Sequence, residues 1–431
     1  LGLHFEDCHE FLFSIHFSNC HLNLSSFYKR KIKNTSFKDC NLQEVDFTEA
    51  DCTNLVFDNC DLARAIFSNT VIEKADLKTS YNYSNLRTYE KRVRIMKVNV
   101  FLLLIVISIT VFPQKEKVPF WAKGVVWYQI FPERFANGDA TNDPEAEKVF
   151  INSRKIPEGW KISKWTSNWF AQSEWEKKLG GDVRNHLYER RYGGDLQGII
   201  DRLDYIKELG IGAIYLNPVF EAVSLHKYDG SSFHHIDVNF GPDPDGDRKI
   251  MSSEIPDNPD TWKWTEADKL FLKLIDEVHK RGMKIIIDGV FNHTGVQFWA
   301  FQDVVNYQEQ SKYKDWYSID AFDDPVTATD EFDYKGWWNI KSLPEFNRTK
   351  DDLAEGPKKY IFNSTRKWMD PNGDGNPSDG IDGWRLDVAR EVPIGFWKQW
   401  RNIVKGINNQ SLIVGELWEL SPDFISDEGA F

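Results

Sequence analysis

Cysteine and tryptophan are each missing from a large part of this 431-residue chain. No cysteine follows Cys60 and no tryptophan precedes Trp121, although the chain holds five cysteines and seventeen tryptophans. Segments of such different chemistry indicate at least two separately built domains, in keeping with the length. The cysteines lack Cys-x-x-Cys spacing and a nearby histidine pattern, so we expect no zinc site.

Positive charge and long apolar runs are also scarce. The formal net charge of −13 disfavours binding to nucleic acid or to an anionic membrane surface, so neither is an expected partner. The apolar run from Val98 to Phe112 is short for a membrane span, which needs about 20 residues. Any membrane contact would have to come from this run.

Large apolar residues recur every five positions in the first 85 residues. A period of five fits neither an α-helix nor an ordinary strand, but it fits a solenoid with a fixed number of residues on each side. Small or thiol residues often stand two positions earlier, and the large residues are Phe17, Leu22, Phe27, Ile32, Phe37, Leu42, Phe47, Cys52, Phe57, Leu62, Phe67, Ile72 and Leu77.

Residues 1–85 resemble the pentapeptide-repeat family, whose fold is a four-sided right-handed β-helix. The resemblance implies that the cysteines are small core residues rather than redox groups. Its function stays open between a passive stacked module, a protein-binding module and an imitation of DNA. The chain opens at Leu1 without a methionine, so we expect the solenoid to be incomplete at its N-terminus.

A signal-like segment follows the solenoid. Residues 86–95 are polar and basic, the apolar run follows Met96-Lys97, and Pro113-Gln114-Lys115 ends it. This order predicts a secretory signal, and therefore a secreted or periplasmic protein. An uncleaved anchor in a bacterial envelope is the alternative, because no clear small-x-small cleavage site is present. We hypothesise that Met96 begins a second protein to which the solenoid has been joined.

Apolar strand-like and helical segments alternate from Lys123 onward. Such alternation predicts a parallel sheet or a (β/α) barrel, with functional residues where the strands end. The expected strands cover residues 124–130, 211–216, 284–290, 381–388 and 411–417, and the expected helices include 196–209 and 267–280.

Two carboxylates end neighbouring expected strands, Asp387 and Glu416. Arg385 stands two residues before Asp387, so both side chains lie on one face of the strand, and the cation should keep Asp387 ionised. Trp418 is expected to raise the pKa of Glu416. A retaining glycosidase needs such a pair about 5–5.5 Å apart. Taken alone, the Arg–Asp pattern is more typical of a structural ion pair, and only the further stretches below favour a catalytic role.

Residues 123–431 resemble the α-amylase family of retaining glycoside hydrolases, most closely its neopullulanase and cyclomaltodextrinase group. The resemblance implies an α/β fold, an incomplete (β/α)8 TIM barrel with an inserted B domain over about 294–379. The domains are then 1–85, 86–116 and 117–431. The matching stretches are Val126 to Phe135, His226 to Asp229, Asp288 to His293, Ser342 to Asn347, Gly383 to Asp387 and Gly415 to Trp418.

The same resemblance assigns roles to residues and implies hydrolysis of α-1,4-glucosidic bonds with retention. Asp387 would be the nucleophile and Glu416 the acid/base. Arg385 would orient Asp387, and Asp288 would hold Arg385. The sugar whose bond breaks would be held by the side chains of His226, His293 and Tyr228. The Trp337-Trp338 pair would line the cleft or fill a core.

A calcium ion is the implied cofactor. Oxygen-bearing side chains crowd around Gly138, and hard cations take such ligands; an ordinary polar turn is the alternative. The implied ligands are Asn137, Asp139, Asn142, Asp143, Gly193 and Asp195. A second loop, Asp370 to Asn376, begins like a calcium-binding hand. It has Ile381 where a glutamate is expected, so we interpret it as a turn.

The sequence departs from the family pattern in two ways. The barrel follows the apolar run almost directly, which leaves the N-terminal β-sandwich used for dimerisation without a counterpart. The family's third catalytic carboxylate and roughly three of eight barrel strands are not in these 431 residues. We therefore expect the polypeptide as written to be inactive and poorly soluble.

Two other classes of function remain open. One is a starch-binding barrel without catalysis, against which Asp387, Glu416 and Arg385 together speak. The other is an interaction module formed by the solenoid. The preferred substrate among starch, maltodextrin, cyclodextrin and pullulan does not follow from the sequence.

Overall fold

The chain divides into two compact units, Leu1–Val111 and Phe112–Phe431, described here separately. The structure is a computed structural model that describes residues 16–80 except 34 and 78, residues 118–425 except 151–154 and 328, and also Leu3 and Phe5. The signal-like segment 86–116 lies outside these residues. Among the helices of the described part, none is long and apolar enough to cross a membrane.

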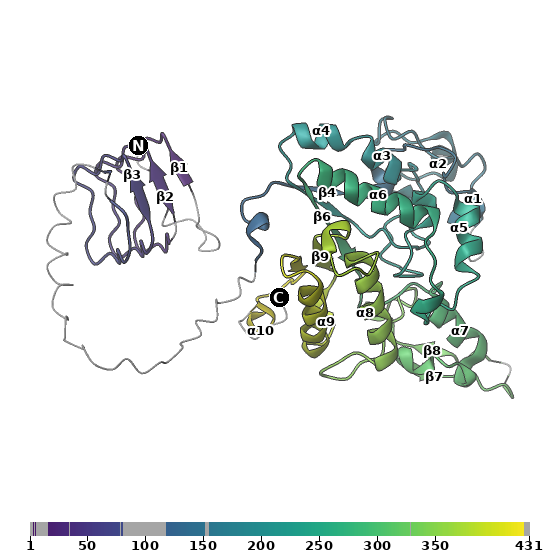
Figure 1. The fold of residues 1–431 in the computed structure, drawn as a ribbon. Helices are drawn as coiled ribbons and strands as arrows, with labels where there is room; N and C mark the ends of the chain where they lie inside the picture. The colour runs from purple at the N-terminus through teal and green to yellow at the C-terminus, as the bar shows by residue number, and fades with distance from the viewer. Residues whose placement is uncertain are drawn as a thin grey trace, which may run out of the picture. The chain divides into compact units, whose positions relative to one another are not determined.

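The first unit is a solenoid with 20 residues in each coil (Figure 1). Its strands β1 (His16–Ser18), β2 (Ser36–Lys38) and β3 (Val56–Asp58) pair in parallel, each with the residue 20 positions further on. Twenty residues are four steps of the five-residue repeat, so each coil has four sides. The predicted pentapeptide-repeat architecture is confirmed.

The interior of the solenoid consists of stacked side chains. Phe37 stacks on Phe57 with ring centroids 5.4 Å apart, and Phe27 stacks on Phe47 at 5.2 Å. Cys40, Cys52 and Cys60 are buried and free of disulfides. Burial raises the pKa of Cys52 to about 12 and that of Cys60 to about 11, so both are thiols at neutral pH. These cysteines therefore fill space, as predicted.

The second unit is organised on a five-stranded parallel sheet whose strand order follows the chain. All five expected strands are present and shorter than expected. Parallel pairing in chain order places the five carboxyl ends on one edge, as in a barrel. The strands are β4 (Trp127–Ile130), β5 (Ala213–Leu216), β6 (Lys284–Gly289), β9 (Gly383–Leu386) and β10 (Leu412–Gly415).

Helices cover the outside of this sheet (Figure 1). The expected helix 267–280 is α6 (Glu266–Lys280), which begins with a capping box between Thr265 and Asp268. The expected helix 196–209 is divided into α3 (Leu196–Ile200) and α4 (Leu203–Glu208), because Arg202 leaves the helical conformation. The other helices are α1 (Ala146–Val149), α2 (Glu174–Leu179), α5 (Pro244–Met251), α7 (Trp299–Tyr307), α8 (Glu355–Met369), α9 (Ile394–Ile407) and α10 (Pro422–Ile425).

An insertion follows β6. It contains α7 and a small antiparallel sheet of β7 (Ile319–Ala321) and β8 (Asp333–Tyr334). The expected B domain, 294–379, also includes α8, but α8 packs beside α9 on the outside of the barrel. The part of the insertion that stands away from the barrel helices therefore ends before α8.

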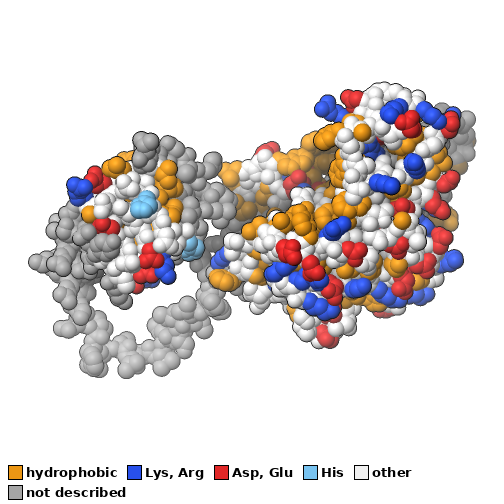
Figure 2. All heavy atoms as spheres, turned by 90° about the horizontal axis from the view of Figure 1, so that it is seen from above, with side chains coloured by type: hydrophobic (Ala, Val, Ile, Leu, Met, Phe, Trp, Pro, Cys, Tyr) orange, Lys and Arg blue, Asp and Glu red, His pale blue; other side chains and the backbone are white. Residues whose placement is uncertain are grey.

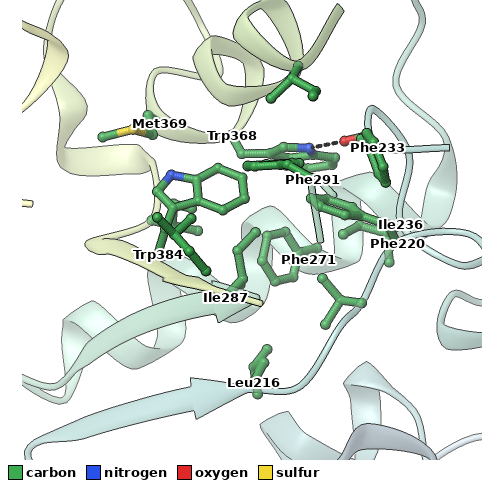
Figure 3. Close-up of a cluster of buried hydrophobic side chains, with 14 of the residues drawn as sticks. Leu216, Phe220, Phe233, Ile236, Phe271, Ile287, Phe291, Trp368, Met369 and Trp384 are labelled. Atoms are coloured by element: carbon green, nitrogen blue, oxygen red, sulfur yellow. Dashed lines mark hydrogen bonds between the residues drawn. The ribbon is translucent and has the colours of Figure 1, made fainter. Parts of the chain in front are cut away.

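Aromatic side chains fill the space between the sheet and its helices (Figure 3). Trp384 of β9 lies among Phe220, Phe291 and Trp400, and the indole N–H of Trp368 donates to the carbonyl of Phe233 at 2.9 Å. Because side chains alternate along a strand, burying Trp384 toward the helices turns its neighbour Arg385 to the opposite face.

The charges of the second unit form no field of one sign on the face drawn in Figure 2. Acidic and basic side chains are interspersed there, with hydrophobic patches between them. The acidic side chains on this face are therefore not gathered into one patch.

Candidate active site

Asp288 lies at the centre of a hydrogen-bonded group at the carboxyl edge of the sheet. It is fully buried near the end of β6. Arg385 Nη1 donates to both of its oxygens at 2.8 Å, and the hydroxyls of Tyr215 and Tyr228 donate to Oδ2 at 2.5 and 3.0 Å. A buried carboxylate needs such donors, so Asp288 has the position expected for a residue that holds Arg385.

Arg385 joins the two carboxylates on which the sequence argument depends. Its Nη1 donates to Asp387 Oδ1 at 2.9 Å, and its Nη2 lies 2.9 Å from Glu416 Oε2. Asp387 directly follows β9, Glu416 directly follows β10, and these strands are hydrogen-bonded neighbours. The structure thus brings Asp387 and Glu416 to one guanidinium, as expected from their places at adjacent strand ends.

The backbone between the two carboxylates is strained. Val388 has φ 38° and ψ 46°, a left-handed conformation that a β-branched residue rarely adopts. Its N–H donates to Glu416 Oε2 at 2.9 Å, and the neighbouring Asp387 N–H donates to the carbonyl of Gly289. Strain of this kind is typical of functional sites and holds because its surroundings fix it.

The expected order of the two pKa values is wrong for this conformation. Burial raises the pKa of Asp387 to about 7, with Asp288 and Glu416 adding repulsion that Arg385 does not offset. Burial acts in the same direction on Glu416, but hydrogen bonds from the Val388 N–H and the Trp418 side chain, with the charge of Arg385, outweigh it and lower its pKa. Trp418 does not enclose Glu416, since its side chain is 56% exposed.

His226 and Tyr228 lie on the hairpin that follows β5. Isolated bridges Phe220–Ile236 and Ala222–Gly230 close this hairpin. Ser224 Oγ lies 3.0 Å from His226 Nδ1, and Asn217 donates to the Tyr228 hydroxyl at 3.0 Å. A hollow of about 670 Å³ lies beside His226, lined also by Tyr188, Asp229, Gln297 and Leu343. The hairpin therefore carries polar groups to the edge of an open space.

His293 is enclosed, with 1% of its surface exposed. Asn292 Nδ2 lies 3.1 Å from its Nδ1, so its Nε2–H donates to the carbonyl of Tyr228 at 3.2 Å. Burial lowers its pKa to about 4 and keeps it neutral. Both ring nitrogens are engaged within the protein in this conformation. The expected hydrogen bond to a sugar hydroxyl would therefore have to replace one of these contacts.

The Trp337-Trp338 pair divides between the two interpretations. Trp337 stacks on His293 at 5.3 Å, as a packed residue does, whereas Trp338 is 64% exposed. Trp338 meets Trp418 at 5.3 Å, beside Glu416. Trp337 thus packs on a histidine of the site, whereas Trp338 presents an exposed ring next to Trp418.

Sequence reasoning missed two groups of this site. Tyr215 and Asn217 contact Asp288 and Tyr228 from β5 and the residue after it. Their alternation at the end of a predicted strand was the available signal, since i and i+2 share a face. Their charge-neutral side chains gave no other sign of a role.

The six residues expected to bind calcium lie together. A Cβ added to Gly193 would lie 2.0 Å from Asp143 Oδ1 and 2.4 Å from Asn137 Nδ2. Asn142 Oδ1 is buried without a hydrogen-bond partner. Burial, with repulsion from Asp195 and Asp139, raises the pKa of Asp143 to about 6.

An unpartnered oxygen beside crowded carboxylates fits a cation. Asn137 now points its amide nitrogen at Asp143, and a half-turn of that amide would present its oxygen instead. Asp195 has a second task. Its carboxylate accepts hydrogen bonds from the N–H groups of Gly138, Asp139 and Gly198, and it caps helix α3.

The second oxygen-rich loop is a series of turns. Asn372 accepts from the Asp374 N–H, Asp374 from Asn376, and Asn376 from Ser378. Ile381, which stands where a calcium-binding hand has its glutamate, is fully buried in the core. The interpretation as turns agrees with this geometry.

Comparison with known proteins agrees with the two units. Residues 129–255 and 264–427 match the family described as alpha amylase, catalytic domain, and residues 4–85 match the pentapeptide repeat region. Neopullulanase 2 of Thermoactinomyces vulgaris is 39% identical over 300 residues, covering 70% of this chain and 40% of that protein. A cyclomaltodextrinase of a Bacillus species is 35% identical over 303 residues, covering 70% and 42%.

Solved structures show the same likeness. The cyclic alpha-maltosyl-(1→6)-maltose hydrolase of Arthrobacter globiformis aligns with a TM-score of 0.51 and 31% identity, covering 72% of this chain and 54% of that one. The type III pullulan hydrolase of Thermococcus kodakarensis aligns with a TM-score of 0.53 and 29% identity, covering 72% and 46%. The chain spans about two fifths of the length of the curated relatives named above. Through residues 129–427, the chain belongs to the α-amylase catalytic-domain family.

Proposed function

We propose that the protein to which this chain belongs is a retaining glycoside hydrolase of α-1,4-glucosidic bonds in starch, maltodextrins, cyclodextrins or pullulan. The observation that carries the proposal is the meeting of Asp387 and Glu416, from the ends of adjacent strands, on Arg385. The similarity to a neopullulanase and a cyclomaltodextrinase supports this class of substrate.

In this proposal Asp387 attacks the anomeric carbon and Glu416 protonates the leaving oxygen. Asp387 must be ionised for attack, and Glu416 must carry a proton. In the site without a sugar, the two pKa values favour the opposite arrangement, with the proton on Asp387 and Glu416 ionised. Binding of the sugar must therefore move Glu416 off Arg385, which leaves the guanidinium to Asp387 and Asp288. Tyr228 would stack on the sugar, with His226 and His293 beside it.

The test is turnover of the whole natural protein with Asp387→Asn. We expect hydrolysis of maltodextrin to fall by about 10⁴-fold or more, while maltodextrin binding by calorimetry is retained. Asp204→Asn, which removes a partner of Arg281 on the exposed side of helix α4, is the matched control and should keep most of the activity. Unchanged turnover in Asp387→Asn would contradict Asp387 as the nucleophile, and binding of maltodextrin without any turnover by the unchanged protein would leave glucan binding as the function.

A calcium ion held by Asn137, Asp139, Asn142, Asp143, Gly193 and Asp195 is part of the proposal, and Asp195 also shapes the loop through its hydrogen bonds. Its support is the unpartnered Asn142 oxygen and the crowding at Asp143. When bound, the ion would tie the loop after β4 to the start of α3. It has no part in the bond cleavage.

We also propose a secreted or periplasmic location, carried on the segment that begins at Met96. The support is the order of basic, apolar and polar residues over 86–115. Fractionation of the natural host followed by N-terminal sequencing tests it. A mature protein that retains residues 1–95 would contradict a separate start at Met96.

A further inference from the structure

A second group of buried charges lies outside the catalytic group. It consists of His234, His235, Glu254, Asp268 and Lys367, whose side chains are at most 7% exposed. The histidines are in the returning half of the hairpin that carries His226 and Tyr228, residues 220–237, here called the substrate hairpin. Glu254 follows α5, Asp268 is in the first turn of α6, and Lys367 is in the last turn of α8. Charges at this depth require mutual neutralisation.

The two ring nitrogens of His235 both face carboxylates. Nδ1 lies 2.9 Å from Asp268 Oδ2, and Nε2 lies 2.8 Å from Glu254 Oε2. An ionised carboxylate only accepts hydrogen bonds, so both contacts are hydrogen bonds only when both nitrogens carry protons. Although burial acts against it, the hydrogen bonds to Asp268 and Glu254 raise the pKa of His235, which agrees with the geometry.

The ring of His234 carries one proton, whereas that of His235 carries two. Two hydroxyls face His234 Nδ1, that of Tyr360 at 2.6 Å and that of Ser232 at 3.0 Å, and either can donate to it. The Nε2–H of His234 then points to Glu254 Oε2 at 3.3 Å. Burial lowers the pKa of His234 to about 3, and the ring is neutral. Two carboxylates thus face two cations, His235 and Lys367, and the buried charge sums to zero.

The side chains of His234, His235 and Glu254 are also near enough to one another for a transition metal to be considered. A divalent ion bound to these three side chains would displace only one proton from them. With Lys367 beside Asp268 at 3.0 Å, it would leave the buried group with an excess positive charge. Because each ring nitrogen already has a hydrogen-bond partner and the buried charges already cancel, the group favours a second proton on His235 over a bound metal ion.

This group holds the base of the hairpin that carries His226 and Tyr228. Asp268 Oδ1 accepts from the Ile236 N–H at 2.8 Å, while its Oδ2 faces His235. Lys367 donates to the His234 carbonyl at 2.5 Å. Phe233 and Ile236, on either side, are inserted in the core (Figure 3). The strand that returns from the substrate hairpin is thus fastened by one imidazolium ring between two carboxylates.

We propose that doubly protonated His235 is a positioning residue that fastens the substrate hairpin, residues 220–237, to helix α6. The role of the hairpin in sugar binding rests on the proposed function, but the fastening does not. Loss of one proton would leave a ring nitrogen facing a carboxylate oxygen without a hydrogen between them. A histidine whose pKa is raised by folding contributes stability below its unfolded value, about 6.5, and this contribution is lost as pH rises through the folded value.

The test measures hydrogen–deuterium exchange of hairpin peptides in the full chain between pH 6 and 9, corrected for the intrinsic rate. We expect protection at pH 6 and about tenfold faster exchange once His235 loses its proton, with other barrel peptides unchanged. His235→Gln should exchange fast at every pH. His279→Gln is the matched control, because it removes a histidine–carboxylate contact at the far end of α6.

Nitrogen chemical shifts of the histidine rings give a second readout that does not depend on a variant that folds. At pH 6, His235 should show two protonated nitrogens and His234 one. A neutral His235 ring at pH 6 would overturn the proposal, as would stoichiometric zinc in the purified chain. Exchange in the hairpin that is independent of pH and of His235→Gln would also overturn it. None of these readouts involves a glucan, so failure here is distinct from failure of the proposed function.

Discussion

The solenoid and the barrel unit differ in what they bury: the interior of the solenoid is almost entirely apolar, whereas that of the barrel unit also contains charged side chains. Each coil of the solenoid repeats the contacts of the coil 20 residues earlier, and its buried side chains are almost all apolar or small. The barrel unit buries charges, and it brings Asp288 and Arg385 together from positions 97 residues apart. A regular repeat can be inferred from its spacing, whereas a buried charge network exists only when distant strands have paired.

The largest effect should come from breaking the charge network of the barrel. Arg385→Met removes the cation that faces Asp288, Asp387 and Glu416. We expect the barrel transition to lose about 3–5 kcal/mol, because an unpaired buried carboxylate remains. Denaturant unfolding followed by tryptophan fluorescence reports on this unit alone, since all tryptophans lie in it.

Arg390→Met is the control for that experiment. Arg390 pairs with Glu419 on the surface, where their side chains are 50% and 73% exposed, so its loss should be nearly silent. If Arg385→Met and Arg390→Met had equal effects, the contrast between a charged and an apolar interior would not hold.

The matching experiment in the solenoid is Phe47→Ala. Phe47 is fully buried between Phe27 and Phe67, so its truncation should destabilise the solenoid by about 3–5 kcal/mol. Circular dichroism of the whole chain should show a lower solenoid transition with an unchanged tryptophan transition. Val56→Ala, at a 40% exposed position, is its control and should cost well under 1 kcal/mol. Coupled loss of both transitions would argue against two independent units.

Asp387, the proposed nucleophile, should destabilise the barrel at neutral pH. Because the pKa of Asp387 is raised to about 7, the folded unit binds a proton more tightly than the unfolded chain. Asp387→Asn should therefore stabilise the barrel by up to about 4 kcal/mol above pH 7. The gain should shrink as pH falls from 7 to 4 and vanish below that. A gain that does not vary with pH would contradict the raised pKa.

The smallest effect we predict is that of calcium. Added calcium should raise the melting temperature of the barrel by a few degrees, about 1–2 kcal/mol, and leave that of the solenoid unchanged. Asp143→Asn should abolish the shift. Asp374→Asn, in the loop of turns, is the matched control and should keep it. A shift that survives Asp143→Asn would place the ion elsewhere.

Much of both units could be predicted because local spacing specifies them. The five-residue repeat predicted the solenoid, and apolar segments predicted all five strands of the sheet and helix α6. The divided helix α3–α4 and the place of α8 could not be predicted, because both depend on packing against neighbouring helices. The candidate site was located by its strand ends, but Tyr215 and Asn217 were missed because neutral residues carry no sign of their partners.

By itself, the sequence determined which side chains share a face. Arg385 lies in β9 and Asp387 directly follows it, and this spacing of two residues directs both side chains to one face before any tertiary contact forms. Only the tertiary structure decided the protonation of the two carboxyls, Asp387 and Glu416. The pKa of a carboxyl depends on burial and on charges brought from other strands. Burial and then Asp288 raise the pKa of Asp387, whereas the hydrogen bond from the strained Val388 amide lowers that of Glu416.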